Sequence, residues 1–323
     1  MSAGRPALVL AWFVAACSWG ASFLFIKWGL EGLSPAQVTL ARVLFGSVFL
    51  AGWLLATRTR LPRDWRTWGH LSMLGLLFCF LPFTLFAWAE TRIDSGLAAV
   101  LNATTPLWTI VLVLLFVPVE TVTVRKAIGL LVGFAGVVVV ALPDLLGGAS
   151  GPVLGQLACL AATACYGVGF VWLRRYVLPR GVRPLVIAFG QVSTGLGWSL
   201  LAAPVLSRDP VTLTPTVVGG MLALGVLGTG LAFVLNTAVT AGLGATFAST
   251  VTYLSPVIGV VLGAVVLGED VTVAAVVGGS VVILGVAVGQ GLLRLPGRRR
   301  RDATAARRRP AVPQPPPAAP VPR

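Results

Sequence analysis

Two short polar patterns, each ending in a proline, are the groups of this apolar chain best suited to contact a solute. Their members are Asn102, Thr105 and Pro106 in one copy, and Thr252, Ser255 and Pro256 in the other. A spacing of three residues keeps both polar groups of a copy on one face of a helix. Such amides and hydroxyls could bind a solute, although small polar residues also pack membrane helices closely. Each proline removes a backbone donor and predicts a kink, which could be a hinge or a fixed bend.

Two charged residues are candidates for binding a charged group or for coupling. Arg42 lies within an apolar stretch, where a charged residue is by default a candidate functional site. It could bind a carboxylate, pair with an acid such as Glu90, or extend its side chain to the outer surface. Glu90 could bind a coupling proton, or it could be an interfacial carboxylate beside Arg92. The sequence does not decide between these interpretations.

Aromatic residues recur at matching positions in the two halves of the chain. Trp19 and Phe23 correspond to Tyr166 and Phe170 at an offset of 147. These rings could form a cavity wall, and ordinary helix packing is the competing interpretation. The further candidates for contact with a solute are Phe83, Trp88 and Asn236. An asparagine in lipid is costly unless it meets a partner or a wet cavity.

Catalytic and metal-binding chemistry finds little support in the sequence. The four cysteines lie in apolar stretches without metal-ligand spacing, and His70 is the single histidine. One histidine makes neither a zinc site nor a catalytic triad. We therefore expect no catalytic residues, no metal, no other cofactor and no enzymatic activity.

The elements that must position these residues are membrane-spanning helices. Of the 323 residues, 57% are hydrophobic and only 11% are charged, and about 20 apolar residues are needed for one crossing. Ten spans are predicted, at residues 7–28, 34–57, 67–89, 95–118, 124–143, 152–173, 184–206, 215–240, 243–268 and 271–293. The fold class is therefore an all-α integral membrane protein.

The chain contains an internal repeat. Residues 98–136 recur as 248–285, first at an offset of 150 and then, from Glu120 and Glu269 onward, at 149. Two repeats of five spans each must face opposite ways across the membrane, so the duplication is inverted. Placing the N-terminus inside puts ten basic residues in the inner loops and three in the outer loops, which predicts that both termini are cytoplasmic. The inner set is Arg58, Arg60, Arg63, Arg66, Arg125, Lys126, Arg174, Arg175, Arg180 and Arg183, and the outer set is Lys27, Arg92 and Arg208.

These residues resemble the drug/metabolite transporter superfamily, specifically the ten-helix EamA-type permeases with two EamA repeats. The motifs that carry the resemblance are residues 19–23 (Trp-Gly-Ala-Ser-Phe), Arg42, residues 95–101 (Ser-Gly-Leu-Ala-Ala-Val-Leu), residues 105–107 (Thr-Pro-Leu), Glu120, residues 248–249 (Ala-Ser), residues 254–256 (Leu-Ser-Pro) and residues 268–269 (Gly-Glu). The first half departs from the usual Gly-Glu ending by having Val119 before Glu120. The resemblance implies transport of small metabolites, amino acids or drugs across the inner membrane by alternating access, without specifying one substrate.

The expected organisation is a first repeat at residues 1–145, a second at 150–293, and a disordered basic Pro/Ala-rich cytoplasmic tail at 294–323. The tail's arginines predict contact with anionic lipid headgroups rather than nucleic acid. A lipoprotein signal ending at Cys17 is disfavoured because the apolar run continues beyond it. The expected function is a secondary transporter, an exporter, of a small-molecule substrate in the cytoplasmic membrane. A membrane receptor or an intramembrane enzyme on the same scaffold is the alternative, and the sequence leaves the substrate, energy coupling and oligomeric state open.

Overall fold

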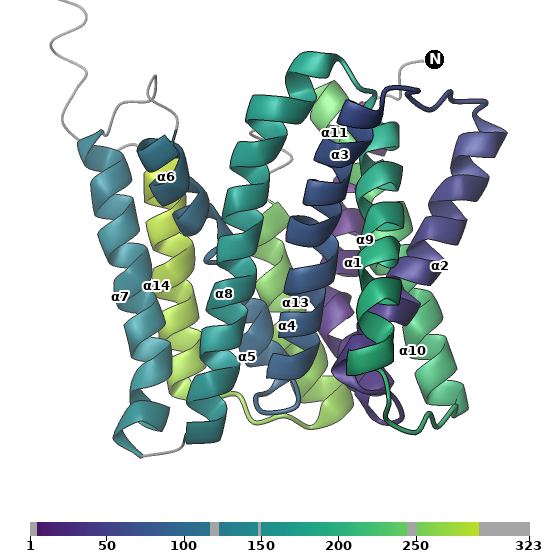
Figure 1. The fold of residues 1–323 in the computed structure, drawn as a ribbon. Coiled ribbons are helices and arrows are strands. Elements are labelled where there is room, and N and C mark those ends of the chain that lie inside the picture. Colours follow the sequence, from purple (N-terminus) through teal and green to yellow (C-terminus); the bar gives the residue numbers. More distant parts are fainter. Residues whose placement is uncertain (1–4, 117–122, 148–149, 244–250, 291–323) are drawn as a thin grey trace, which may run out of the picture.

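The structure is a computed structural model that describes residues 5–116, 123–147, 150–243 and 251–290 (Figure 1). Within these ranges the chain is helical and contains no strand. The helices at the first five predicted spans are α1 (Arg5–Leu30), α2 (Pro35–Ala56), α3 (Trp65–Leu74) continued by η1 (Gly75–Phe80) and α4 (Leu81–Ala89), α5 (Ser95–Asn102) with α6 (Thr105–Phe116), and α7 (Val124–Leu146). Those at the second five are α8 (Ser150–Trp172) continued by η2 (Leu173–Val177) and η3 (Leu178–Arg180), α9 (Pro184–Leu206), α10 (Pro215–Gly225) continued by η4 (Val226–Leu231) and α11 (Ala232–Leu243), α13 (Val251–Leu267), and α14 (Val273–Gln290).

The described helices follow the predicted spans closely. Seven helical stretches of the described chain are long and apolar enough to cross a membrane, and two shorter apolar helices lie within α13 and α14. The predictions for Glu120, for residues 248–249 and for the tail at 294–323 fall outside the described residues. The all-α membrane fold predicted from composition is confirmed.

The span predicted at residues 95–118 is interrupted next to Pro106, where the sequence predicts a kink. There α5 ends at Asn102 and α6 begins at Thr105 after a turn. Pro106 has no N–H to donate to the carbonyl of Asn102. That carbonyl instead accepts a hydrogen bond from Thr105 Oγ1, at 2.9 Å. The shared face predicted for Asn102 and Thr105 is therefore interrupted.

The two repeats run in opposite directions. In Figure 1, α1 leaves the end at which the N-terminus lies, whereas its sequence counterpart α8 runs toward that end. The wide π-helical turns η1 and η4 occur at equivalent places in the third and eighth spans. Such turns are rare and frequently lie at functional sites. The inverted repeat predicted from the loop charges is present in the fold.

Glycine contacts between α7 and α14 show the pseudo-two-fold relation residue by residue. A methyl carbon placed on Gly129 would lie 2.6 Å from the carbonyl oxygen of Gly285, and one on Gly285 would lie 2.7 Å from that of Gly129. The same reciprocal approach, at 2.7 Å in both directions, joins Gly136 and Gly278. The sequence repeat maps the first contact onto the second, since it pairs Gly129 with Gly278 and Gly136 with Gly285. Only glycine lets two helix backbones approach this closely.

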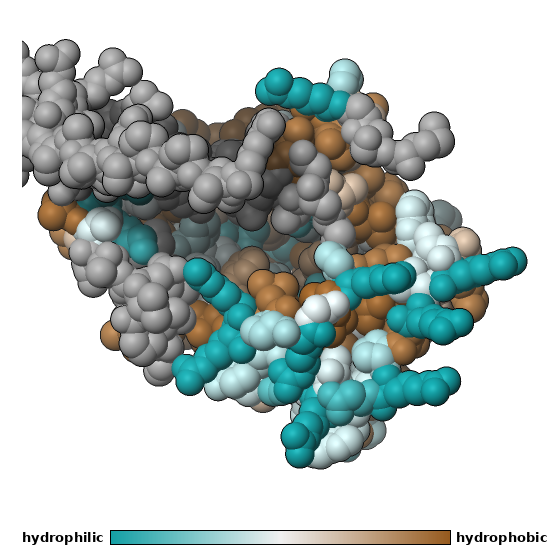
Figure 2. Space-filling model, turned by 90° about the horizontal axis from the view of Figure 1, so that it is seen from above, coloured by the Kyte–Doolittle hydropathy of each residue, from teal (hydrophilic) through white to brown (hydrophobic). Residues whose placement is uncertain are grey.

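The opposite ends of the bundle carry opposite charge. Figure 2 looks onto one end and shows long hydrophilic side chains around its rim, with the surface receding near the centre. Exposed arginines mark this end, which we call the basic end: Arg58, Arg60, Arg63, Arg66, Arg174, Arg175, Arg180 and Arg183. The loops at the other end, which we call the acidic end, contain Glu31, Glu90, Asp94, Asp209, Glu269 and Asp270. Both described chain termini, Arg5 and Gln290, lie at the basic end (Figure 1).

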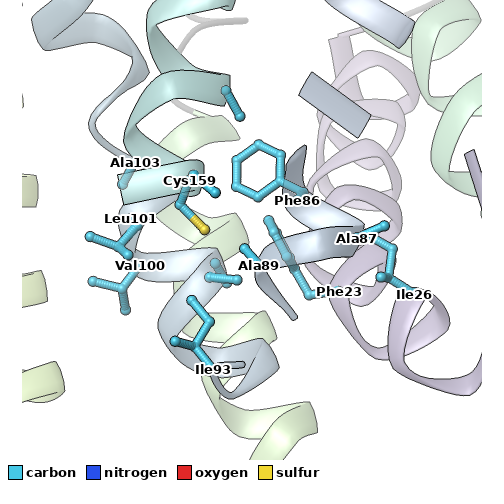
Figure 3. Close-up of a cluster of buried hydrophobic side chains, with 14 of the residues drawn as sticks. Phe23, Ile26, Phe86, Ala87, Ala89, Ile93, Val100, Leu101, Ala103 and Cys159 are labelled. Carbon is cyan, nitrogen blue, oxygen red and sulfur yellow. The ribbon is translucent and has the colours of Figure 1, made fainter. Parts of the chain in front are cut away.

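Toward the acidic end the bundle is held by an apolar cluster that both repeats build (Figure 3). Phe23 of α1 meets Phe86 of α4 edge-on, with ring centroids 5.7 Å apart. Cys159 of α8 and Leu101 of α5 are fully buried in the same cluster. Between helices in lipid, such rings and aliphatic side chains stabilise the fold by close van der Waals packing and not by leaving water. The cluster fixes the helix ends that carry the groups described next.

Candidate functional site

Arg42 is the centre of a site that both repeats build. It lies on α2 with 7% of its surface exposed, so the alternative in which it extends to the outer surface was wrong. Its Nε donates a hydrogen bond to Thr229 Oγ1 of η4, at 3.0 Å. The Thr229 hydroxyl donates in turn to the carbonyl of Leu224, five residues earlier in the widened turn, at 3.2 Å. This bond orients the oxygen lone pairs of Thr229 toward the guanidinium.

The guanidinium of Arg42 keeps unused donors. Its Cζ lies 3.6 Å from the ring centroid of Phe83, so the ring covers one face of the cation. Of the five N–H donors of an arginine, only the one on Nε has a hydrogen-bond partner among the described residues. A buried cation is costly unless an anion compensates it, and the described chain supplies no ion pair to Arg42. The site is therefore suited to receive an anion from outside the chain.

Aromatic rings from both repeats form a connected series close to Arg42. The ring of Phe86 lies 6.2 Å from that of Tyr166 on α8, and Phe78 of η1 lies 5.9 Å from Tyr166. Phe78 also meets Phe170 edge-on at 5.0 Å. Tyr166 interacts electrostatically with the Arg42 guanidinium. The rings offer an apolar wall beside a cation.

Trp19, a candidate aromatic of α1, contacts a ring of the second repeat. Trp19 meets Phe233 of α11 edge-on, at 6.1 Å between ring centroids. Trp19 and Tyr166 are half-buried, while Phe170 is 43% exposed. Sequence reasoning missed Phe78 and Thr229 altogether. Their only signal was position, because both lie in the π-helical turns that α-helical spacing does not describe.

Other candidates lie elsewhere. Trp88 stacks with Arg92 at the acidic end, where the Arg92 Cζ lies 3.5 Å from the ring centroid. Ser255 donates to the carbonyls of Val251 and, at 3.4 Å, of Ala16, which gives its hydroxyl a role in packing α13 on α1.

The remaining candidates are the two prolines, the two asparagines and Thr252. Pro256 lies inside α13, whereas Pro106 is the second residue of α6. Asn102 and Asn236 are half-buried. The side chain of Thr252 lies outside the described residues. The structure therefore brings Phe83 and Tyr166 together with Arg42. The Asn102/Thr252 pairing stays a prediction.

The acidic end is closed by a bond between the repeats. Glu269, in the loop after α13, accepts from Ser95 N and Ser95 Oγ, each at 2.8 Å, and from Gly96 N at 3.0 Å. It thereby caps the first turn of α5, where a negative charge is favourable. Gly263 leaves room for this carboxylate, since a methyl carbon there would clash with its oxygen. Asp94, at the ordinary capping position, makes no such bond.

Glu90 lies beneath this closure. Only 2% of its surface is exposed, and neither carboxylate oxygen has a hydrogen-bond partner among the described residues. Glu90 stays at the helix end, as the interfacial interpretation expects, but it is buried, and the guanidinium of Arg92 lies over Trp88 instead. Burial first, and then the charge of Glu269, raise the pKa of the neighbouring Asp94 in the same loop. The described residues contain no group of His, Cys, Asp and Glu side chains that could hold a metal ion.

Comparison with known proteins gives consistent results. Residues 6–142 and 153–288 match the model of the EamA-like transporter family. The chain is 27% identical to the uncharacterized transporter YdfC of Bacillus subtilis, over 83% of this chain and 86% of that protein. It is also 27% identical to the uncharacterized inner membrane transporter YedA of Escherichia coli K12, over 79% of this chain and 81% of that protein.

Two further relatives cover nearly the whole chain. The probable terminal-alkyne amino-acid exporter of Streptantibioticus cattleyicolor is 27% identical over 93% of this chain and 98% of its own length. A crystal structure of a protein with 23% identity superimposes with a TM-score of 0.62, covering 90% of this chain and 99% of that one. At this identity the structural likeness supports the fold alone.

Proposed function

The chain belongs to the EamA-like transporter family, and we propose that it exports a small amino acid with an apolar side chain across the cytoplasmic membrane. The named relatives are transporters, and this chain is accordingly a membrane transporter. The substrate class, the direction and the role of Arg42 are the proposal. Transport proceeds by alternating access, in which the two inverted repeats expose one shared site to each side in turn.

The observation that carries the proposal is the buried cation between the repeats. Arg42 is held by Thr229 and Phe83, yet its terminal N–H groups have no partner among the described residues. A carboxylate accepts two parallel N–H bonds from a guanidinium, and such charge-assisted bonds are about twice as strong as neutral ones. The carboxylate of an amino acid would compensate the charge that the described chain leaves uncompensated. Thr229 and Phe83 would keep the guanidinium in place for it.

The apolar part of the substrate is inferred from the surroundings of Arg42. Phe86, Tyr166, Phe78 and Phe170 offer aromatic surface rather than further charges. The relative whose name describes export of a terminal-alkyne amino acid also handles an amino acid with an apolar side chain. Both observations favour a solute that combines a carboxylate with a small apolar or aromatic group.

The two ends of the bundle support the proposed orientation and the proposed direction of transport. The basic end would face the cytoplasm, because positively charged loops stay on that side. The surface recedes near the centre of this end (Figure 2), while Glu269 joins the repeats at the acidic end. This arrangement supports a state open toward the cytoplasm, from which an exporter loads its substrate.

The test is solute flux in liposomes containing the purified full chain. Uptake of labelled L-phenylalanine and L-propargylglycine, a terminal-alkyne amino acid, should be saturable and absent from empty liposomes. Phenylalaninamide, which lacks the carboxylate, should compete at least about tenfold more weakly, because a charge-assisted hydrogen bond contributes about 1.5–3 kcal/mol. Equal competition by the amide would refute carboxylate recognition, and no flux of any amino acid would refute the proposed function. Accumulation in inside-out membrane vesicles, but not in right-side-out ones, tests export.

A further inference from the structure

We propose that Glu90 binds a proton that crosses the membrane together with the solute whose carboxylate binds Arg42. The inference rests on the proposed function, because it needs a solute carboxylate on Arg42. Glu90 follows the last residue of α4, and its backbone N–H still donates to the carbonyl of Phe86 at 2.9 Å. Its carboxyl group therefore has a fixed place at the end of a rigid helix.

The turn that carries Glu90 is pressed against the second repeat. A methyl carbon on Gly155 of α8 would lie 2.9 Å from Ile93 Cγ2 and 3.3 Å from the carbonyl oxygen of Ala89. This contact leaves Glu90 with 2% of its surface exposed and both oxygens without a hydrogen-bond partner in the described chain. A buried carboxylate without a partner is costly in its charged form. The closed arrangement therefore holds this group with its proton.

The titratable groups that face Glu90 come from four packed elements. They are Lys27 of α1, Arg42 of α2, Cys159 of α8 and Glu269 of the loop after α13. Lys27 is engaged elsewhere, since its Nζ donates to the carbonyl of Ile93 at 2.9 Å. Glu269 is occupied by the first turn of α5. Neither of these neighbours donates a hydrogen bond to the Glu90 carboxylate.

Opening of the acidic end would let the proton leave. When Glu269 separates from Ser95 and Gly96, water reaches Glu90, and the carboxyl dissociates into a carboxylate and a hydrated proton. Only an O–H bond breaks, and the proton passes to water at the acidic end. When that end closes and the basic end opens, Glu90 takes a new proton from water that enters from the basic end, so that one proton crosses in each cycle. Glu90 thus exchanges its proton during the same conformational change that releases the solute.

The sign of the coupling follows from Arg42. The guanidinium attracts an ionised Glu90, since the two groups interact electrostatically. The negative charge of a solute carboxylate on Arg42 offsets this attraction, so the ionised form of Glu90 becomes less stable relative to the protonated form. Proton and anion therefore favour each other's binding, and reciprocity makes the effect mutual. Both would be carried in the same direction, with high internal solute driving export.

The test measures protons and solute together. Liposomes containing the full chain and the pH dye pyranine receive an L-phenylalanine gradient, and the expected result is proton movement in the direction of the solute. E90Q mimics the protonated acid, so solute-driven proton movement should fall at least tenfold while phenylalanine counterflow continues and loses its dependence on pH. E31Q, which changes an exposed acid at the same end, should behave like the wild type.

Several outcomes would overturn the inference. Proton movement by E90Q at the wild-type level would do so, as would phenylalanine flux without protons in the wild type. Proton movement opposite to the solute would refute the shared direction. If E90Q does not fold, E90D retains the carboxyl and should keep proton coupling with a displaced pH profile; an unchanged profile contradicts the assignment. Absence of any solute flux in the wild type would refute the proposed function, and this inference with it.

Discussion

The site around Arg42 has a counterpart in the other repeat, and the two share backbone geometry but not chemistry. The repeat pairs Arg42 with Gln191, and Thr229 with Cys79. On one side a methyl carbon on Gly225 would lie 3.0 Å from the carbonyl oxygen of Arg42. At the equivalent crossing, a methyl carbon on Gly75 would lie 2.7 Å from the carbonyl oxygen of Gln191. Both helix crossings therefore depend on a glycine at the equivalent place.

The side chains at the two crossings differ in charge and in hydrogen bonding. Arg42 has a cation bonded to the Thr229 hydroxyl, whereas Gln191 is a buried amide opposite a thiol. Phe83, which covers the guanidinium of Arg42, corresponds in sequence to Phe233. Close backbone packing thus uses glycine at both crossings, whereas only one crossing carries a cation that could bind an anion.

The largest expected effect, on thermal stability, comes from disrupting the glycine contacts that both repeats supply between α7 and α14. Gly136→Ala and Gly285→Ala place a methyl group against backbone atoms 2.7 Å and 2.3 Å away, respectively. Both should lower the melting temperature of the detergent-solubilised protein strongly and by similar amounts, since overpacking typically costs about 1–3 kcal/mol. Gly52→Ala has open space around the new methyl group and is the matched control. A strong effect of only one of the two variants would contradict equivalent packing.

The next effect removes the difference between the two sites. Arg42→Gln gives both crossings a glutamine, and phenylalanine flux should fall by about 10- to 100-fold, because charge-assisted hydrogen bonds contribute about 1.5–3 kcal/mol. The matched variant Gln191→Leu should stay within about threefold of the wild type, because no charge is lost. Similar losses in both variants would show that the two positions serve packing alone. Flux is measured at equal amounts of folded protein in the liposomes.

A smaller effect sharpens the comparison at the partner of each residue. Thr229→Val removes the hydroxyl that accepts from Arg42 Nε but keeps the shape of the side chain. The KM for phenylalanine should rise about threefold to tenfold, less than on loss of the guanidinium itself, because this charge-assisted bond positions the cation and does not contact the solute. Cys79→Ser at the equivalent position should leave the KM unchanged. A lower kcat with an unchanged KM in Thr229→Val would contradict a role in positioning the guanidinium.

The smallest effect concerns two equivalent helix starts with different chemistry. Asp64 begins α3 and accepts from Arg66 N and Thr67 N, and Thr214 begins α10 and accepts from Val217 N. These hydrogen bonds, the backbone one from Arg66 first, lower the pKa of Asp64. Asp64→Ala and Thr214→Ala should both lower the melting temperature slightly at neutral pH.

Acid distinguishes these two caps. A lowered carboxyl pKa stabilises the fold above the ordinary pKa, and that stabilisation is lost as the pH falls through the folded value. The difference between wild type and Asp64→Ala should therefore shrink in acid, whereas the Thr214→Ala difference should not depend on pH. A pH-independent Asp64→Ala difference would contradict the assignment. Thermal melting across pH values measures both.

Much of the fold could be predicted because lipid leaves few alternatives. Long apolar runs, turn residues and loop charges located the helices. Gly129 and Gly136 recur at 278 and 285 in the sequence, but only the structure shows that the helices carrying them pack together. Pro106 predicted a kink here, but not the full break after Asn102, where the hydroxyl of Thr105 bonds to the carbonyl that Pro106 cannot reach. A proline signals a bend in the sequence, but not which side chain satisfies the freed group.

The candidate site was predicted in part. Arg42 and the rings of Tyr166 and Phe170 could be named because a charge in lipid and aromatic recurrence are visible in the sequence. Thr229 and Phe78 could not be, because each lies in a π-helical turn that shifts the side chains away from the positions an α-helix would give them. The sequence likewise put Glu90 at a helix end without indicating that α8 would cover it.

The sequence by itself determined the solvent, the number of spans and the inverted duplication, because each follows from composition, length and charge counted along the chain. Only the tertiary structure decided which charged side chains are buried and which have partners. Arg42 and Glu90 lie on different helices, and their surroundings come from residues more than a hundred positions away, such as Thr229 and Glu269. Burial and hydrogen bonding depend on those distant neighbours, and so does the chemistry that a charged group can perform.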